Sequence, residues 1–177
     1  MLVDAKLMIN GKELKTQIEI DEVDLEFIEE KKENEEKHKF NGYERCGAHN
    51  RYSYVNGKGE VNTEFDVGVD EDDLRFVIAN YYSSGGVARN NARADRLMRQ
   101  LRRFAVENRK DKIDWNDGKK HKYNICYSYP TQEIFVDVKS NCRNFEIYFD
   151  SCGVAERAIE EFKDELIWYF TEYKDSL

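Results

Sequence analysis

The stretch YSSGGVAR at residues 82–89 recurs as FDSCGVAE at residues 149–156. Each copy follows an aromatic segment typical of a strand and opens a pattern typical of a helix. Internal similarity of this kind indicates one supersecondary unit used twice. The copies share a serine and a Val-Ala step, but Arg89 and Arg93 of the first helix align with Glu156 and Glu160 of the second. Since the fold does not require that difference in charge, it is the clearest clue to function.

Alternating apolar and polar residues before each copy predict strands. The first unit has candidate strands at 51–55, 60–62 and about 76–82, and the second has them at 122–127, 134–138 and 145–149. Ser83 or Ser84 is expected to cap a first helix that ends near Asn108, with Ser151 in that role for a second, single helix. The first helix has one apolar face, formed by Leu97, Leu101, Phe104 and Ala105.

These elements predict an α+β fold. Two β-β-β-α units, at about 43–108 and 118–174, are expected to form one antiparallel sheet with both helices on one face. Ahead of this domain, which we assign to residues 39–177, residues 1–38 predict a β-hairpin arm and a charged linker. Asn10-Gly11 marks the hairpin turn, because both central turn positions need a positive φ.

The composition is acidic and unevenly distributed. The 177 residues carry a net charge of −8, yet residues 84–112 hold nine bases and three acids. A general nucleic-acid binder would be basic overall, so a local contact is the more consistent expectation. No apolar run approaches the ~20 residues of a membrane span, and the N-terminal residues do not resemble a secretion signal. We therefore expect a cytoplasmic protein with four reduced cysteines and no contact with a membrane.

The basic charge gathers on one side of the first predicted helix. On a helical wheel five arginines fall within about 120° of one another. Arginine suits phosphate because its planar fork makes two hydrogen bonds at once. The pattern favours a phosphate-contacting ridge on RNA or DNA, or else a solvated face paired with acids of the arm or of residues 64–73. The ridge consists of Arg89, Arg93, Arg96, Arg99 and Arg103.

The N-terminal arm carries a second charged candidate. Carboxylates near its second strand could occupy a basic groove on a partner protein, although charges on edge strands also serve solubility. We assign partner binding to Asp21, Glu22, Asp24 and Glu26.

Catalytic and metal-binding signals are weak. Cys46 and His49 have a metal-like spacing, and His38, His121 and Cys126 are the other candidate ligands for a zinc ion. The acids at 70–73 could hold Mg²⁺, but an acidic loop is usually a solvated turn. No nucleophile or phosphate-loop motif is present. The sequence favours a binding protein over an enzyme, with no catalytic residues and no cofactor.

Several motifs together resemble a known family. They are the Gly-Glu-Val step at 59–61, the helix start at 80–84, the Arg-Phe-Ala helix end at 103–105, the Ile-Asp-Trp-Asn-Asp linker at 113–117 and the strands at 122–127 and 147–149. In order and spacing they resemble small accessory proteins of Firmicutes phages and mobile elements. Some similar members inhibit type II CRISPR–Cas9.

The resemblance implies an inhibitor of host antiviral defence. The expected activity is that of an anti-CRISPR protein in the bacterial host cell, which binds Cas9 or its guide-RNA complex through charged surfaces. Two alternatives stay open. One is a metal-dependent RNase or a trigger of guide-RNA truncation, and the other is a structural or dimeric phage accessory protein. The sequence does not set the oligomeric state.

Overall fold

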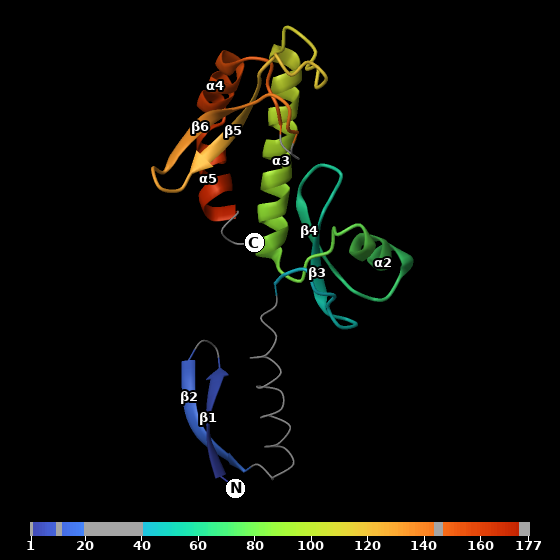
Figure 1. Ribbon diagram of the computed structural model, residues 1–177. Coiled ribbons are helices and arrows are strands. Elements are labelled where there is room, and N and C mark those ends of the chain that lie inside the picture. The colour runs from blue at the N-terminus through green and yellow to red at the C-terminus, as the bar shows by residue number, and fades with distance from the viewer. Residues whose placement is uncertain (1, 10–11, 20–40, 144–146, 174–177) are drawn as a thin grey trace. The chain divides into compact units, whose positions relative to one another are not determined.

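The computed structural model describes residues 2–9, 12–19, 41–143 and 147–173 (Figure 1). Its fold class is α+β. The chain divides into two compact units, residues 1–41 and 42–177, and each is considered by itself.

In the first unit, residues 2–9 and 12–19 form a two-stranded antiparallel sheet. Strand β1 (Leu2–Ile9) pairs with β2 (Lys12–Glu19), and Ile9 stands opposite Lys12. Two residues therefore connect the strands, which is the length of the commonest hairpin loops. The turn Asn10-Gly11 itself lies outside the described residues, as does the segment 20–40, so the arm as a whole stays a prediction.

Helix α3 (Gly85–Asn108) is the long element of the second unit. Of the two predicted caps, Ser84 serves: its hydroxyl accepts the backbone N–H of Val87 at 3.4 Å. The predicted apolar face is buried, with Leu97 and Leu101 at its centre. Phe149, which precedes the C-terminal helices, and apolar side chains of those helices complete this core. The helix residues are Val154, Ala155, Ala158 and Leu166.

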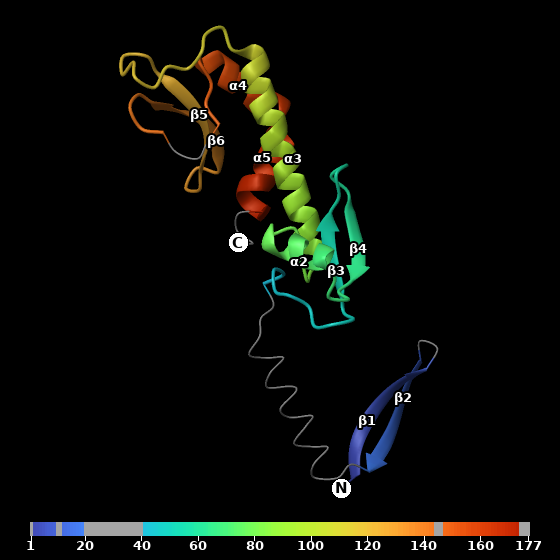
Figure 2. The same ribbon diagram turned by 90° about the vertical axis from the view of Figure 1, so that its right-hand side faces the viewer.

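The first hairpin packs on the N-terminal half of α3. Strands β3 (Arg51–Val55) and β4 (Val61–Phe65) are antiparallel, and both contact α3. Ser53 of β3 forms an isolated bridge with Tyr82, which lies just before the helix. Both views show the hairpin beside this half of α3 (Figure 1, Figure 2).

The predicted third strand at 76–82 is wrong. Residues Asp70–Val77 form helix α2, and only the single bridge at Tyr82 remains of the strand. The apolar run at 76–78 suggested a strand, but four acids in the first turn favour a helix there because they complement its dipole. The helix ends at Ile78, and Ala79 has a left-handed φ of 56°.

The second hairpin packs on α4. Strands β5 (Lys122–Ser128) and β6 (Glu133–Lys139) match the predicted strands to within a residue and contact α4 (Cys152–Glu161). Tyr123 of β5 bridges Phe149, just as Ser53 bridges Tyr82 in the first hairpin. Residues 144–146 of the predicted third strand lie outside the described residues.

The predicted single C-terminal helix is also wrong. The chain forms α4, then α5 (Lys163–Trp168) and a π-helix (Tyr169–Tyr173). The interruption lies at Phe162, whose backbone (φ −109°, ψ 21°) leaves the helical region. Its ring packs edge-on against Phe104 of α3, so a core contact accompanies the break.

The strands of the described residues do not merge into the predicted single sheet. They form three separate two-stranded sheets, β1–β2, β3–β4 and β5–β6. Within the second unit the reason is the packing partner: β3–β4 lies on α3, whereas β5–β6 lies on α4, and α3 contacts α4. The hairpins therefore cover different helices instead of pairing edge to edge.

Gly42, the first residue of the second unit, packs closely against the start of α3. Gly42 has a φ of 90°, and a Cβ added there would lie 2.5 Å from Cγ2 of Val87 and 3.3 Å from Cβ of Ser84, at the start of α3. Its carbonyl accepts the backbone N–H of Ser83 at 3.0 Å, so it cannot move away without losing that bond.

Gly42→Ala is therefore expected to lower the free energy of unfolding by about 2 kcal/mol or more, from the left-handed backbone and overpacking together. Gly57→Ala is the matched control, since nothing lies within 4 Å of the added Cβ. Urea denaturation of both variants tests this. A Gly42→Ala protein as stable as Gly57→Ala would contradict it.

Candidate nucleic-acid interface

The five predicted arginines lie along one side of α3. Arg89, Arg96, Arg99 and Arg103 are exposed. The stripe of Leu97, Leu101 and Phe104 lies beside this arc and is buried, so packing fixes which way the arginines point. We call these four residues the arginine face.

Arg93 has a different role. Its guanidinium donates Nε to Oε2 of Glu165 at 2.8 Å and Nη2 to Oε1 at 3.1 Å. The same group stacks over the buried Trp168, 3.9 Å from the ring centroid. Such a bidentate and stacked arrangement uses both properties that distinguish arginine from lysine. Arg93 therefore ties α3 to α5, and we leave it out of the arginine face.

Most of the arginine face is free of internal ion pairs. In the part of the chain that the structure describes, Arg89, Arg96 and Arg99 form none. Arg103 lies 4.0 Å from Glu107 one turn further on, and both side chains are exposed. A pair of that kind contributes little because solvent screens it. The charges are thus available to a ligand.

A cleft of about 1060 Å³ borders this face. Arg89, Arg93 and Arg96 line one wall. The rest of the lining comes mainly from the end of α4, the start of α5 and the β3–β4 hairpin, and it holds five acids and one base, Lys163. The acids are Glu60, Glu160, Glu161, Asp164 and Glu165. Arg99 and Arg103 lie outside the cleft, further along α3.

The acids of residues 64–73 do not pair with α3. Asp66 and Asp72 are buried, whereas a solvated turn was expected at 70–73, and Asp72 joins α2 to Tyr52 of the first hairpin. Arg45 donates Nε to Oδ2 of Asp66 at 3.0 Å, and Tyr81 donates its hydroxyl to the same oxygen at 2.9 Å. These bonds lower the pKa of Asp66, with the Arg45 bond the larger cause.

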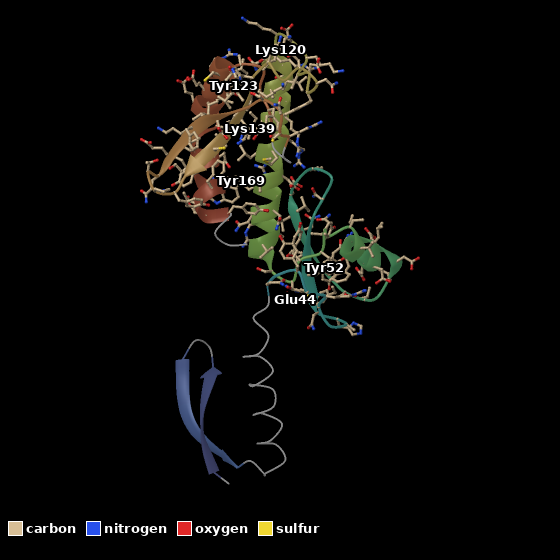
Figure 3. All side chains as sticks on the ribbon, viewed as in Figure 1. Glu44, Tyr52, Lys120, Tyr123, Lys139 and Tyr169 are labelled. Atoms are coloured by element: carbon tan, nitrogen blue, oxygen red, sulfur yellow. The ribbon has the colours of Figure 1, made fainter. Side chains whose placement is uncertain are left out.

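Asp72 is the centre of the same network. It accepts the hydroxyl of Tyr52 at 2.7 Å and the backbone N–H groups of Val67, Gly68 and Val69. The bond from Tyr52 is the main reason that its pKa lies below the ordinary value. Burial raises the pKa of Tyr52 to about 12. Tyr52 lies on β3 where the strand faces α2 (Figure 3).

Sequence reasoning missed the two arginines of this network. Arg75 pairs with Glu64 and Glu71 and stacks on Tyr54, with 3.7 Å to the ring centroid. Arg45 pairs with Asp73 as well as Asp66. The i,i+4 spacing of Glu71 and Arg75 was a usable signal. The other pairings join residues 11 to 28 positions apart and carry no local signature.

The candidate metal ligands are not brought together. Among the described residues no group of three His, Cys, Asp or Glu side chains could hold a metal ion. The thiol of Cys46 instead donates to the carbonyl of Arg51, and His121 contacts Ser140. His38 lies outside the described residues. The acidic arm residues Asp21, Glu22, Asp24 and Glu26 lie outside them as well.

The depressed pKa of Asp72 sets the sign of a pH effect. Near pH 3 to 4 the unfolded state binds more protons than the folded state, so stability rises with pH there. The contribution of this carboxylate is complete above about pH 5 and is lost as the pH falls below its unfolded pKa of about 3.9 toward the lower folded value.

Asp72→Asn should therefore cost about 2 kcal/mol at pH 7, as expected for lost bonds to a buried charge. The gap between it and the wild type should narrow as the pH falls from 5 to 2. Asp70→Asn replaces an exposed carboxylate in the same first turn of α2, and it should change the free energy of unfolding by no more than about 0.5 kcal/mol. Urea denaturation across pH measures all three. A gap that widens in acid would contradict the assignment.

No helix in the described part of the chain is both long and apolar enough to cross a membrane. Comparison with known proteins gives no relative: no family model matches the chain, and neither a curated protein nor a solved structure is similar to it.

Proposed function

We propose that the protein is a binding protein whose arginine face contacts the phosphate backbone of RNA. The observation that carries the proposal is the row Arg89, Arg96, Arg99 and Arg103 on α3, exposed and largely free of internal ion pairs. Four guanidinium groups on one side of a rigid helix present a line of fork-shaped donors, which is the geometry that phosphate oxygens accept.

The acids that line the cleft direct the ligand along α3. A phosphate inside the cleft would meet Glu160, Glu161 and Asp164 as well as Arg89. Like charges repel there, so the backbone is expected to leave the cleft and follow Arg96, Arg99 and Arg103 toward the C-terminal end of the helix. The surrounding net charge of −8 restricts RNA to this face and disfavours general binding.

We further propose that the RNA is the guide RNA of Cas9 and that the protein inhibits host defence in the cytoplasm of a bacterium. This choice of target is supported by the resemblance of residues 42–170 to accessory proteins of phages and mobile elements. On this proposal the acidic arm residues Asp21, Glu22, Asp24 and Glu26 contact a basic surface of Cas9, while the arginine face contacts its RNA.

The two halves of the second unit are proposed to be copies of one unit. Each has a hairpin whose first strand forms one bridge to an aromatic residue, Tyr82 or Phe149. A helix follows directly in each half, with a fully buried alanine, Ala88 or Ala155, at the equivalent position of its first turn. One copy then carries arginines where the other carries glutamates.

The full chain is tested with labelled guide RNA, free and bound to Cas9. Replacement of Arg96, Arg99 and Arg103 by Glu should weaken binding at least about tenfold, since three phosphate contacts become repulsive. Between 50 and 200 mM salt the wild-type affinity should fall about 30-fold, as expected for three to four contacts to a single strand.

The matched control reverses three exposed bases that lie beyond the end of α3, Arg109, Lys112 and Lys119. It changes the total charge equally and should alter the affinity no more than about threefold. Equal losses in both variants would mean that bulk charge, not this face, governs binding. Absence of association with Cas9 in either state, or cleavage of the RNA by the protein, would contradict the proposed function.

A further inference from the structure

Helix α2 exposes its apolar side and buries its polar side. Its apolar residues Leu74, Val77 and Ile78, at i, i+3 and i+4, share one side, and they are 58%, 79% and 59% exposed. The polar residues on the other side point inward: Asp72 is 2% exposed, and the side chain of Arg75 is 11% exposed. A surface helix normally has the reverse arrangement. We call Leu74, Val77 and Ile78 the α2 patch.

The inward side of α2 explains why the helix holds this orientation. Asp72 and Arg75 both bond the hydroxyl of Tyr52 on β3, and Arg75 also pairs with Glu64 of β4. Rotating the helix to bury the patch would leave these charged groups without partners, at a cost greater than the apolar burial gained. The polar network therefore keeps the α2 patch exposed. Helix α2 itself lies beside the β3–β4 hairpin (Figure 1).

Acidic side chains share the outward side of the helix. Asp70, Glu71 and Asp73 occupy the first turn on the same arc as the α2 patch, and all three are exposed. Glu71 and Asp73 pair with Arg75 and Arg45, whereas Asp70 forms no ion pair within the described residues. The outward side is thus acidic at its start and apolar at its end. Residues 60–83 as a whole hold seven acids and one base.

This distribution of charge indicates which kind of molecule can bind to the α2 patch. The segment 20–40 of the same chain holds nine acids and four bases, so the acidic turn repels it. In a second copy docked face to face with α2 antiparallel, the acidic turn of each copy would lie against the apolar end of the other, where charge is poorly accommodated. RNA would be repelled by the acidic turn as well. A segment with lysine or arginine beside an apolar stripe complements both halves of the surface at once.

We propose that the α2 patch docks a cationic amphipathic helix of a partner protein, in the manner of a helix that lays its apolar side on a hydrophobic surface. This site is separate from the arginine face and does not depend on RNA binding. It would give the protein two contacts of opposite charge: an acidic and apolar one for protein and a basic one for nucleic acid.

The probe is a fluorescent peptide of about 18 residues, long enough to form a helix, with leucines on one side and lysines on the other. Binding to the full-length protein is followed by fluorescence anisotropy. A peptide of the same composition in scrambled order, and one with glutamates in place of the lysines, serve as comparison probes. We expect binding of the first peptide and at least tenfold weaker binding of the other two.

Leu74→Gln with Val77→Gln should weaken binding of the lysine peptide at least tenfold, and Asp70→Lys should weaken it about threefold or more. The matched controls are Val106→Gln with Ile167→Gln, exposed apolar residues elsewhere, and Glu133→Lys, an exposed acid elsewhere. These should bind within twofold of the wild type. All replaced side chains are exposed, so circular dichroism should show the same fold throughout.

Three results would overturn the proposal. The first is no binding by the wild type, and the second is equal binding of the ordered and scrambled peptides or of all variants. The third is a dimeric mass in solution that Leu74→Gln with Val77→Gln converts to a monomer, because a second copy would then occupy the patch.

Discussion

The second unit depends on the burial of α3 along two of its sides. Near its start the helix presents small residues, Ala88 and Ala92, on which the first hairpin and the returning C-terminal segment lie closely. Further along it presents Leu97, Leu101 and Phe104 to α4 and the second hairpin. Since one helix supports both halves, the side between them stays exposed except at Arg93, which contacts α5. That side carries the arginines, and packing therefore determines where the charge is displayed.

A second constraint lies in the polar interior of the first hairpin. Tyr52 and Tyr81 stack with ring centroids 4.0 Å apart, and their hydroxyls bond Asp72 and Asp66. A buried carboxylate is tolerated only when it is fully bonded, so this network allows little freedom in how α2 meets the hairpin. The exposed apolar side of α2 follows from the same requirement. Stability of the hairpin and display of the patch are two results of one set of bonds.

The sequence predicted the features that depend on local pattern. The stripe Leu97, Leu101 and Phe104 located α3, and a cap at Ser83 or Ser84 marked its start to within one residue, because helix periodicity and capping are short-range effects. The prediction of a strand at 76–82 was wrong because the apolar run there resembles a strand. The helix that forms instead is held by a bond between Asp72 and the distant Tyr52, which no local pattern indicates. The sequence also failed to separate Arg93 from its neighbours. All five arginines follow one another at helical steps of three or four residues. Only the approach of Glu165 and Trp168 in the folded chain distinguishes Arg93 from the others.

The central proposal is that the exposed arginines of α3 bind phosphate, whereas Arg93 holds α3 to α5. Nuclear magnetic resonance of the arginine Nε–H groups tests it most directly, as RNA is added to the full-length protein. The signals of Arg96, Arg99 and Arg103 should shift with increasing RNA, and that of Arg93, held by Glu165, should stay in place. Shifts at Arg93 equal to those of the other three, or no shift along α3 at any RNA concentration, would contradict the proposal.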